Sequence, residues 1–134
     1  MKKHGNIVLP SLLRVTASGA IDGIDKTPFQ VYNDAATVGY ANAFPDKDGI
    51  IRSFVASTAT SDSFALSIAK KSSPDIFLPE KNAKILIDYR SKPYDRYRVV
   101  SFYKAYNGIW EDYNGEKVDI RGKNVLIGDY DESL

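Results

Sequence analysis

The 134-residue chain contains no cysteine, and this absence removes several classes of site. Without cysteine the chain can form neither a disulfide nor a zinc-thiolate centre, and it has no thiolate nucleophile. His4 is the single histidine, so a histidine cluster for catalysis or metal binding is excluded as well. Opposite charges nearly cancel, with 18 Lys and Arg against 17 Asp and Glu, so no net field attracts the chain to nucleic acid or to an acidic membrane.

Long apolar runs are also missing. No run approaches the roughly 20 residues that a membrane-spanning helix needs, and nothing after Met1 has the pattern of a signal peptide. The composition is nevertheless 43% hydrophobic, which at this length is enough to bury the core of one ordinary domain. Residues 1–134 are therefore expected to form a single domain.

Short apolar runs predict several strands. The segment Asn6–Pro10 has the composition of a buried strand that ends in a turn at its proline. The nearly all-apolar run Ala83–Tyr89 is expected to be an interior strand covered on both faces, and Arg121–Gly128 is expected to end in another buried strand. By contrast, the glycines and aspartates of Ser18–Lys26 follow no clear period, so this stretch is expected to be a loop.

Capping signals predict three helices. The stretch Thr27–Gln30 has the spacing of a capping box with proline at the first helical position, so a helix is expected to begin there. A second helix is expected to be capped by Ser61 or Asp62 and to stop at Pro74. A third, of one or two turns, is expected over Ser101–Asn107, with a serine cap and an Asn-Gly exit.

Two alternating runs are joined by an Asp-Gly pair. In Val38–Phe44 large residues alternate with small ones, which is typical of a strand against which another element packs closely. The run Ile50–Ser57 is its expected antiparallel partner. Asp48 and Gly49 favour a hairpin turn over a calcium loop, because Val55 stands where such a loop needs its glutamate. The sequence thus predicts an α/β fold with a mixed β-sheet, a central antiparallel hairpin and flanking helices.

A basic and aromatic segment follows at Tyr89–Arg98. Such a segment can stack on single-stranded nucleic acid, but the nearly balanced charge of the chain argues against this, and we expect no nucleic-acid partner. A solvated loop with tyrosines packed on arginine stems is the favoured interpretation. Recognition of a small anion stays open, with Arg90 and Arg98 as guanidinium forks.

Other polar residues show no catalytic pattern. Ser11, Ser18 and Ser101 have no identifiable base partner, and the acidic stretch Asp129–Glu132 has the composition of a frayed terminus. We therefore assign no catalytic residue, no metal ligand and no cofactor from the sequence.

In their order along the chain, these motifs resemble the second type of CHASE domain. The resemblance runs from Asn6 to Gly128 and implies an extracytoplasmic sensor domain of a bacterial receptor, linked to an adenylate cyclase, a histidine kinase or a serine/threonine kinase. It also implies membrane-spanning helices on both sides and further sensor strands upstream, so the chain is expected to be part of a larger sensor. The most specific part of the resemblance is the spacing of Gly39, Asn42, Asp46, Asp48, Gly49 and Arg52.

The resemblance supplies no catalytic residues and no agreed ligand, so the binding site is sought among polar side chains. Asn42 and Arg52 stand on the two arms of the expected hairpin, where their neighbours are apolar. Together with Asp48, Tyr89 and Arg90 they are expected to bind an unidentified small molecule. A structural role is preferred for the aspartates of the turn, because both can accept hydrogen bonds from turn amides.

Two other functions stay open. The chain could be a soluble small-molecule-binding or enzymatic α/β domain of the cytoplasm, or a dimerisation module whose partner is a second copy of itself. A ligand that raises the melting temperature without being turned over would favour a sensor or binder over an enzyme.

Overall fold

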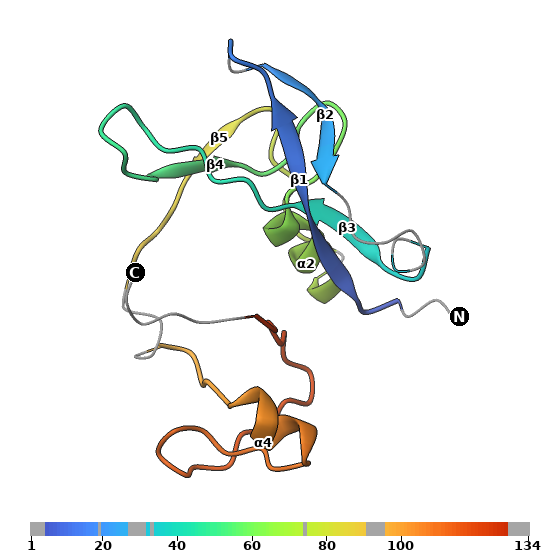
Figure 1. The fold of residues 1–134 in the computed structure, drawn as a ribbon, viewed down its shortest axis with the longest axis vertical. Helices are drawn as coiled ribbons and strands as arrows, with labels where there is room; N and C mark the ends of the chain where they lie inside the picture. The colour runs from blue at the N-terminus through green and yellow to red at the C-terminus, as the bar shows by residue number, and fades with distance from the viewer. Residues whose placement is uncertain are drawn as a thin grey trace. The chain divides into compact units, whose positions relative to one another are not determined.

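The computed structural model describes residues 5–18, 20–26, 32, 34–73, 75–90 and 96–128. The chain divides into two compact units, Met1–Asp88 and Tyr89–Leu134. Among these described residues, the first unit contains two small sheets and a helix, and the second contains a short helix and a turn-rich segment (Figure 1). The expected helix start at Thr27–Gln30 and the acidic stretch Asp129–Glu132 lie outside the described residues.

The first sheet has the strand order β2-β1-β3. Its central strand, β1 (Val8–Val15), pairs antiparallel with β2 (Ile21–Lys26) and parallel with β3 (Thr37–Tyr40). A second sheet pairs β4 (Ser53–Val55) antiparallel with β5 (Lys84–Leu86). The predicted α/β fold with a mixed sheet is confirmed, but β1 and β2 form an antiparallel hairpin in place of the two runs that were expected to pair.

Strand β1 does not end at Pro10, contrary to the expectation, but continues to Val15. The carbonyl groups of Ile7 and Ser11 accept hydrogen bonds from the β3 side of the sheet at 3.0 and 2.9 Å. In a parallel ladder alternate residues make the bonds, so the nitrogen of Pro10 points away from β3. The donor that proline lacks is therefore not needed at this position.

The expected loop at Ser18–Lys26 is wrong over most of its length, because β2 occupies its second part. Ile21 lies opposite Val15 and Ile24 opposite Leu13, so the antiparallel pair has apolar cross-strand contacts. Two irregularities in the register interrupt the alternation, which explains why no clear period was visible.

The runs on either side of the Asp-Gly turn do not pair with each other, contrary to the expectation. Strand β3 ends at Tyr40, whose N–H donates to the carbonyl of Asp62 at 3.1 Å. The next residue, Ala41, donates its N–H to the carbonyl of Ser11 at 2.9 Å. These bonds hold the chain after β3 against β1 and the start of the helix, and β4 takes β5 as its partner instead.

Helix α2 spans Phe64–Ser72 and packs against β1 and β3. Its N-cap is Ser63, whose hydroxyl accepts a hydrogen bond from the N–H of Leu66 at 3.1 Å. The expected caps, Ser61 and Asp62, lie two residues and one residue too early, respectively. Two lysines in the last turn are placed favourably for the helix dipole, as expected.

Gly39 marks the closest approach of β3 to α2. A Cβ atom at Gly39 would lie 2.7 Å from Ser67 Oγ and 2.8 Å from the Cα of Phe64, so no side chain fits there. The prediction that another element packs closely against the small residues of this run is confirmed. Among the residues that the structure describes, the buried hydrophobic side chains are Leu13, Ala35, Tyr40, Ala56 and Leu66.

Neither of the two apolar runs that were expected to be buried is buried, since the first is partly exposed and the second is exposed throughout. In β5, one of only two strands in its sheet, Leu86 is 80% exposed. Residues 121–128 form no strand in the described part of the chain, and Ile127 is also 80% exposed. Apolar composition identifies a surface that can be covered, but it does not show that a partner covers it.

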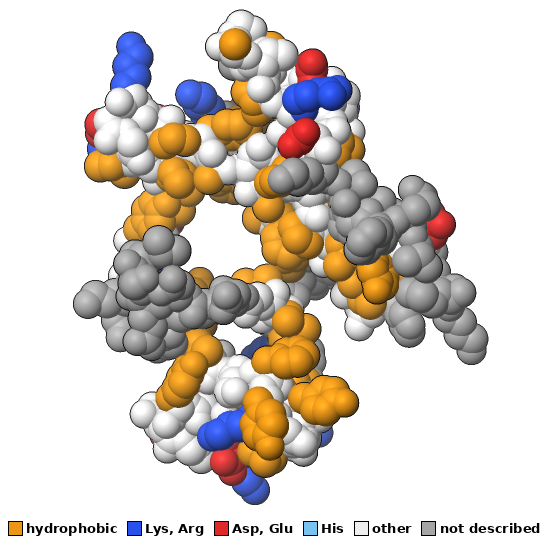
Figure 2. Space-filling view, in the orientation of Figure 1, with side chains coloured by type: hydrophobic (Ala, Val, Ile, Leu, Met, Phe, Trp, Pro, Cys, Tyr) orange, Lys and Arg blue, Asp and Glu red, His pale blue; other side chains and the backbone are white. Residues whose placement is uncertain are grey.

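In the second unit, α4 spans Phe102–Tyr106 and is flanked by Ser101 and Asn107. The expected short helix and its exit are confirmed, because Asn107 is the C-cap and Gly108 follows with φ of +78°. Figure 2 shows hydrophobic side chains gathered over the position of α4. The exposed aromatic residues of this helix are Phe102, Tyr103 and Tyr106.

Asp112 organises the turn that follows in the second unit. Its Oδ1 atom accepts hydrogen bonds from the N–H groups of Asn114 and Glu116 at 2.9 and 3.0 Å. Arg98 forms ion pairs with both Asp112 and Glu116. Burial opposes ionisation of Asp112, but Arg98 and the two amides outweigh it and keep the pKa of Asp112 low. Arg98, considered from the sequence as an anion fork, is thus engaged within the chain.

Candidate functional site

The Asp-Gly turn predicted from the sequence is confirmed. Gly49 has φ of +82°, a conformation that glycine adopts readily, and its N–H donates to the carbonyl of Asp46 at 2.9 Å. The carboxylate of Asp48 accepts a hydrogen bond from the N–H of Ile50 at 3.2 Å, as expected for a turn aspartate. Within the described residues, no group of three or more His, Cys, Asp or Glu side chains could hold a metal ion.

Arg52 forms ion pairs with both aspartates of this turn. Its Nη2 atom lies 2.7 Å from Asp48 Oδ2, and its Nη1 atom lies 2.9 Å from Asp48 Oδ1 and 3.2 Å from Asp46 Oδ2. The bonds from Arg52 and from the Ile50 amide lower the pKa of Asp48. The side chain of Arg52 is 48% exposed, so a ligand anion could reach it, but it would compete with two carboxylates already in place.

Asn42 lies just after β3 and is attached to β1. Its Oδ1 atom accepts a hydrogen bond from the N–H of Leu13 at 2.7 Å, and its Nδ2 atom donates to the carbonyl of Leu13 at 3.1 Å. The side-chain amide therefore imitates a neighbouring strand and satisfies both backbone groups of one residue. This arrangement gives Asn42 a structural role.

The other predicted ligand residues, Tyr89 and Arg90, belong to the second unit, and Tyr89 is 71% exposed. The structure brings Asp48 and Arg52 together directly, whereas Asn42 is bonded to β1. Binding of a ligand by these five residues stays a prediction.

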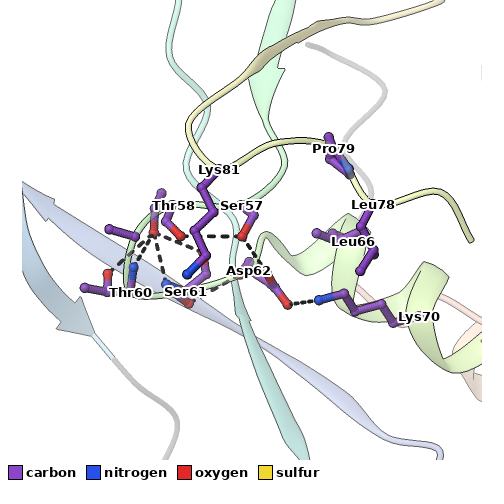
Figure 3. Close-up of a pocket in the computed structure, with 11 residues that line it drawn as sticks. Ser57, Thr58, Thr60, Ser61, Asp62, Leu66, Lys70, Leu78, Pro79 and Lys81 are labelled. Atoms are coloured by element: carbon purple, nitrogen blue, oxygen red, sulfur yellow. Dashed lines mark hydrogen bonds and ion pairs between the residues drawn. The ribbon is translucent and has the colours of Figure 1, made fainter.

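A pocket of about 380 Å³ lies where β4 leads into α2 (Figure 3). This volume is within the range of small-molecule sites in proteins. The wall is formed by the loop Ser57–Asp62, by Leu66 and Lys70 of α2, and by Leu78, Pro79 and Lys81.

Thr58 shapes the loop on one side of this pocket. Its buried hydroxyl accepts hydrogen bonds from the N–H groups of Ser61 and Thr60 at 3.0 and 3.3 Å and donates to the carbonyl of Ser61 at 3.0 Å. The hydroxyls of Thr60 and Ser61 make only long bonds, of 3.4 Å to Thr58 Oγ1 and 3.3 Å to the carbonyl of Asp62. Because such long bonds are weak, both hydroxyls can turn toward a ligand at small cost.

Asp62 is held between two partners at the end of the loop. Its Oδ2 atom lies 2.6 Å from Lys70 Nζ, and its Oδ1 atom accepts a hydrogen bond from the hydroxyl of Ser57 at 2.7 Å. Burial opposes ionisation, but Lys70, Ser57 and the charge of Lys81 outweigh it and lower the pKa of Asp62. The group is an ionised carboxylate with both oxygens engaged, which makes it a poor proton acceptor.

Lys81 is brought to the pocket by a turn. The N–H of Ala83 donates to the carbonyl of Glu80 at 3.2 Å, and Asn82 has φ of +62°, which asparagine tolerates better than most residues. The N–H of Asn82 donates to the carbonyl of Ser57 at 2.6 Å, so the turn is fixed to the loop. The side chain of Lys81 makes no hydrogen bond or ion pair with any described residue.

The chain was compared with family models, with curated proteins and with solved structures. The model of the CHASE2 domain matches residues 1–134, the whole chain. The chain belongs to the CHASE2 family. CHASE2 domains are sensory rather than catalytic, and they are typically extracellular parts of membrane receptors. No curated protein and no solved structure matched the chain.

The resemblance inferred from the sequence is thus confirmed for this CHASE2 domain. Within its described part, no helix combines the length and the hydropathy that crossing a bilayer requires.

The pocket of this CHASE2 domain was not anticipated from its sequence. A local signal was present, because Ser57–Ser63 contains five Ser or Thr among seven residues and leads into a helix. The second part of the site had no such signal. Lys81 reaches the pocket only because a turn at Asn82 binds Ser57, 25 residues earlier in the chain.

Proposed function

We propose that this chain is the ligand-sensing part of a bacterial transmembrane receptor, that it lies outside the cytoplasm, and that it controls a cyclase or kinase inside the cell. The observation that carries this proposal is the match of the CHASE2 domain model to the entire chain. The pocket beside α2 supports it, because it offers a small molecule both charged and apolar groups.

Signalling in this proposal requires no reaction within the domain. A ligand that binds one conformation more tightly shifts the population toward that conformation, and the shift cannot exceed the difference between the two binding free energies. The charged groups of the pocket suit binding rather than proton transfer, since Asp62 is already paired with Lys70. We therefore propose that the domain binds a ligand and catalyses no reaction.

The proposed location can be tested with reporter enzymes in the natural gene, keeping everything encoded upstream of the fusion point. Alkaline phosphatase, which is active only after export, is fused after Gly128, and β-galactosidase, which is active only inside the cell, is fused at the same point. We expect an active phosphatase and an inactive galactosidase. The reverse pair of results would contradict the receptor and favour a soluble binding or enzymatic domain of the cytoplasm.

The five predicted ligand residues can be tested through Arg52. Arg52→Ala is expected to reduce ligand-dependent output of the intact receptor more than it reduces stability, because exposed ion pairs contribute little to folding. Output is measured as cyclase or kinase activity, and stability as the denaturation midpoint of the domain.

A matched control is Arg121→Ala. Arg121 also pairs with an aspartate of its own turn, with Nη2 lying 2.8 Å from Asp119 Oδ2, and it too is exposed. If the two substitutions reduce output equally, Arg52 has no special role in ligand binding. If Arg52→Ala lowers stability as much as output, its role is structural.

A further inference from the structure

The pocket beside α2 has an uncompensated positive charge. It is lined by two lysines and a single aspartate, and Asp62 is paired with Lys70. Lys81 is left without a partner among the described residues, although its charge acts on Asp62. An ammonium group at the edge of a concave surface attracts an anion, and the nearby carboxylate disfavours a second negative charge on that ligand.

Hydroxyl groups lie on the same side as this charge. Figure 3 shows the side chain of Lys81 extending toward the part of the loop that carries Thr60 and Ser61. Both hydroxyls have only long hydrogen bonds within the chain, at 3.4 and 3.3 Å, and can donate to an anion instead. The helix N-terminus itself is not the anchor, because Ser63 already accepts the bond from Leu66 N–H.

The opposite wall of the pocket is apolar. Leu66 belongs to the core and is 6% exposed, while Leu78 is 54% exposed and stands beside Pro79 in the lining. A ligand that covers Leu78 would remove apolar surface from water, which stabilises the complex in proportion to the area buried. A purely inorganic anion would leave this wall unused.

We propose that the pocket binds a small organic acid with one carboxylate and a short apolar chain. The carboxylate pairs with Lys81 and accepts hydrogen bonds from Thr60 and Ser61, and the apolar chain lies against Leu66 and Leu78. This proposal rests on the proposed sensor function, because it names the class of ligand that the sensor would detect.

The test is a calorimetric titration of the 134-residue chain with acetate, 4-methylpentanoate and phenylacetate near neutral pH, each compared with its neutral amide. Saturable binding is expected for 4-methylpentanoate or phenylacetate, with the matching amide weaker by roughly tenfold or more. Absence of saturable binding for all three acids would overturn the proposal. Acid and amide binding equally would also overturn it, and this comparison needs no variant. Phosphate binding as tightly as the best acid would overturn the role of the apolar wall.

Two variants assign the binding to this pocket. Lys81→Met is expected to weaken binding of the best acid by roughly tenfold, whereas Lys47→Met, which removes an equal charge from the Asp-Gly turn, is expected to change it less than about twofold. Equal weakening by both variants would show a nonspecific charge effect and overturn the site. The titration in solution does not depend on membrane topology, so its failure is distinguishable from failure of the reporter experiment.

Discussion

Replacing Tyr40 by alanine is expected to lower the free energy of unfolding by about 3 to 5 kcal/mol, the range for deleting a large aromatic side chain from a core. Tyr40 is 2% exposed, and its hydroxyl donates to the carbonyl of Val55. Its N–H also donates to the carbonyl of Asp62. Burial and the charge of Asp62 raise the pKa of Tyr40, so the hydroxyl remains a donor at neutral pH. One side chain thus fills the core and joins β3 to β4.

Denaturant unfolding of three variants separates these contributions. Tyr40→Phe keeps the ring and loses only the hydrogen bond, so it is expected to cost about 0.5 to 1.5 kcal/mol. Tyr103→Ala removes the same side chain from the exposed helix α4, where Tyr103 is 75% exposed, and is expected to stay within about 0.5 kcal/mol of wild type. A loss for Tyr40→Ala no larger than that for Tyr40→Phe would contradict the packing of the ring.

Replacing Gly39 by alanine is expected to lower the free energy of unfolding by about 2 to 3 kcal/mol, as for an overpacked core. The added Cβ would lie 2.7 Å from Ser67 Oγ, 2.8 Å from Phe64 Cα and 2.9 Å from Phe64 N. The serine side chain can rotate away, but the backbone of Phe64 is the first turn of α2 and cannot move alone. The helix would have to separate from β3.

The matched control for this substitution is Gly49→Ala. Gly49 has φ of +82°, but no atom lies within 4 Å of the position that a Cβ would take. Its cost is only the strain of the left-handed conformation, about 1 to 2 kcal/mol. Unfolding midpoints are compared, and a smaller loss at Gly39 than at Gly49 would show that α2 can withdraw from the strand.

The parts of the fold that were predicted correctly have local causes. The turn at Gly49 and the exit of α4 at Gly108 depend on backbone conformations that a few neighbouring residues determine. The close contact at Gly39 was indicated in the sequence by the alternation of large and small residues, although the sequence did not show that α2 is the element in contact. Local chemistry was therefore sufficient for turns and helix ends, with errors of one or two residues at the cap of α2.

The pairing of strands had no comparable local cause. Strand β3 pairs with β1, and Asn42 extends this contact by bonding both backbone groups of Leu13, 29 residues away. Nothing in the sequence near Asn42 indicates that Leu13 is its partner. The run at 121–128 was misjudged for a different reason, since an apolar side chain such as Ile127 gives the same signal whether or not it is covered.

The pocket was not predicted from the sequence for two reasons: its local signal was ambiguous, and part of its lining comes from residues distant in sequence. Its loop could have been noticed as a cluster of hydroxyl residues, but hydroxyls also cap helices and form turns, as Ser63 and Thr58 do here. Lys81 joins the loop through a turn distant in sequence, so the position of its charge beside the loop is visible only in three dimensions.

The contact at Gly39 also determines how far a local movement can spread. Beside Gly39 the Ser67 hydroxyl and the backbone of Phe64 leave no space even for a Cβ atom, so the helix cannot move closer to the strand. The loop that ends at Ser63 is continuous with that helix. A displacement of the helix toward the strand therefore acts on β3, and through its ladder on β1. Gly39 makes this part of the domain mechanically stiff.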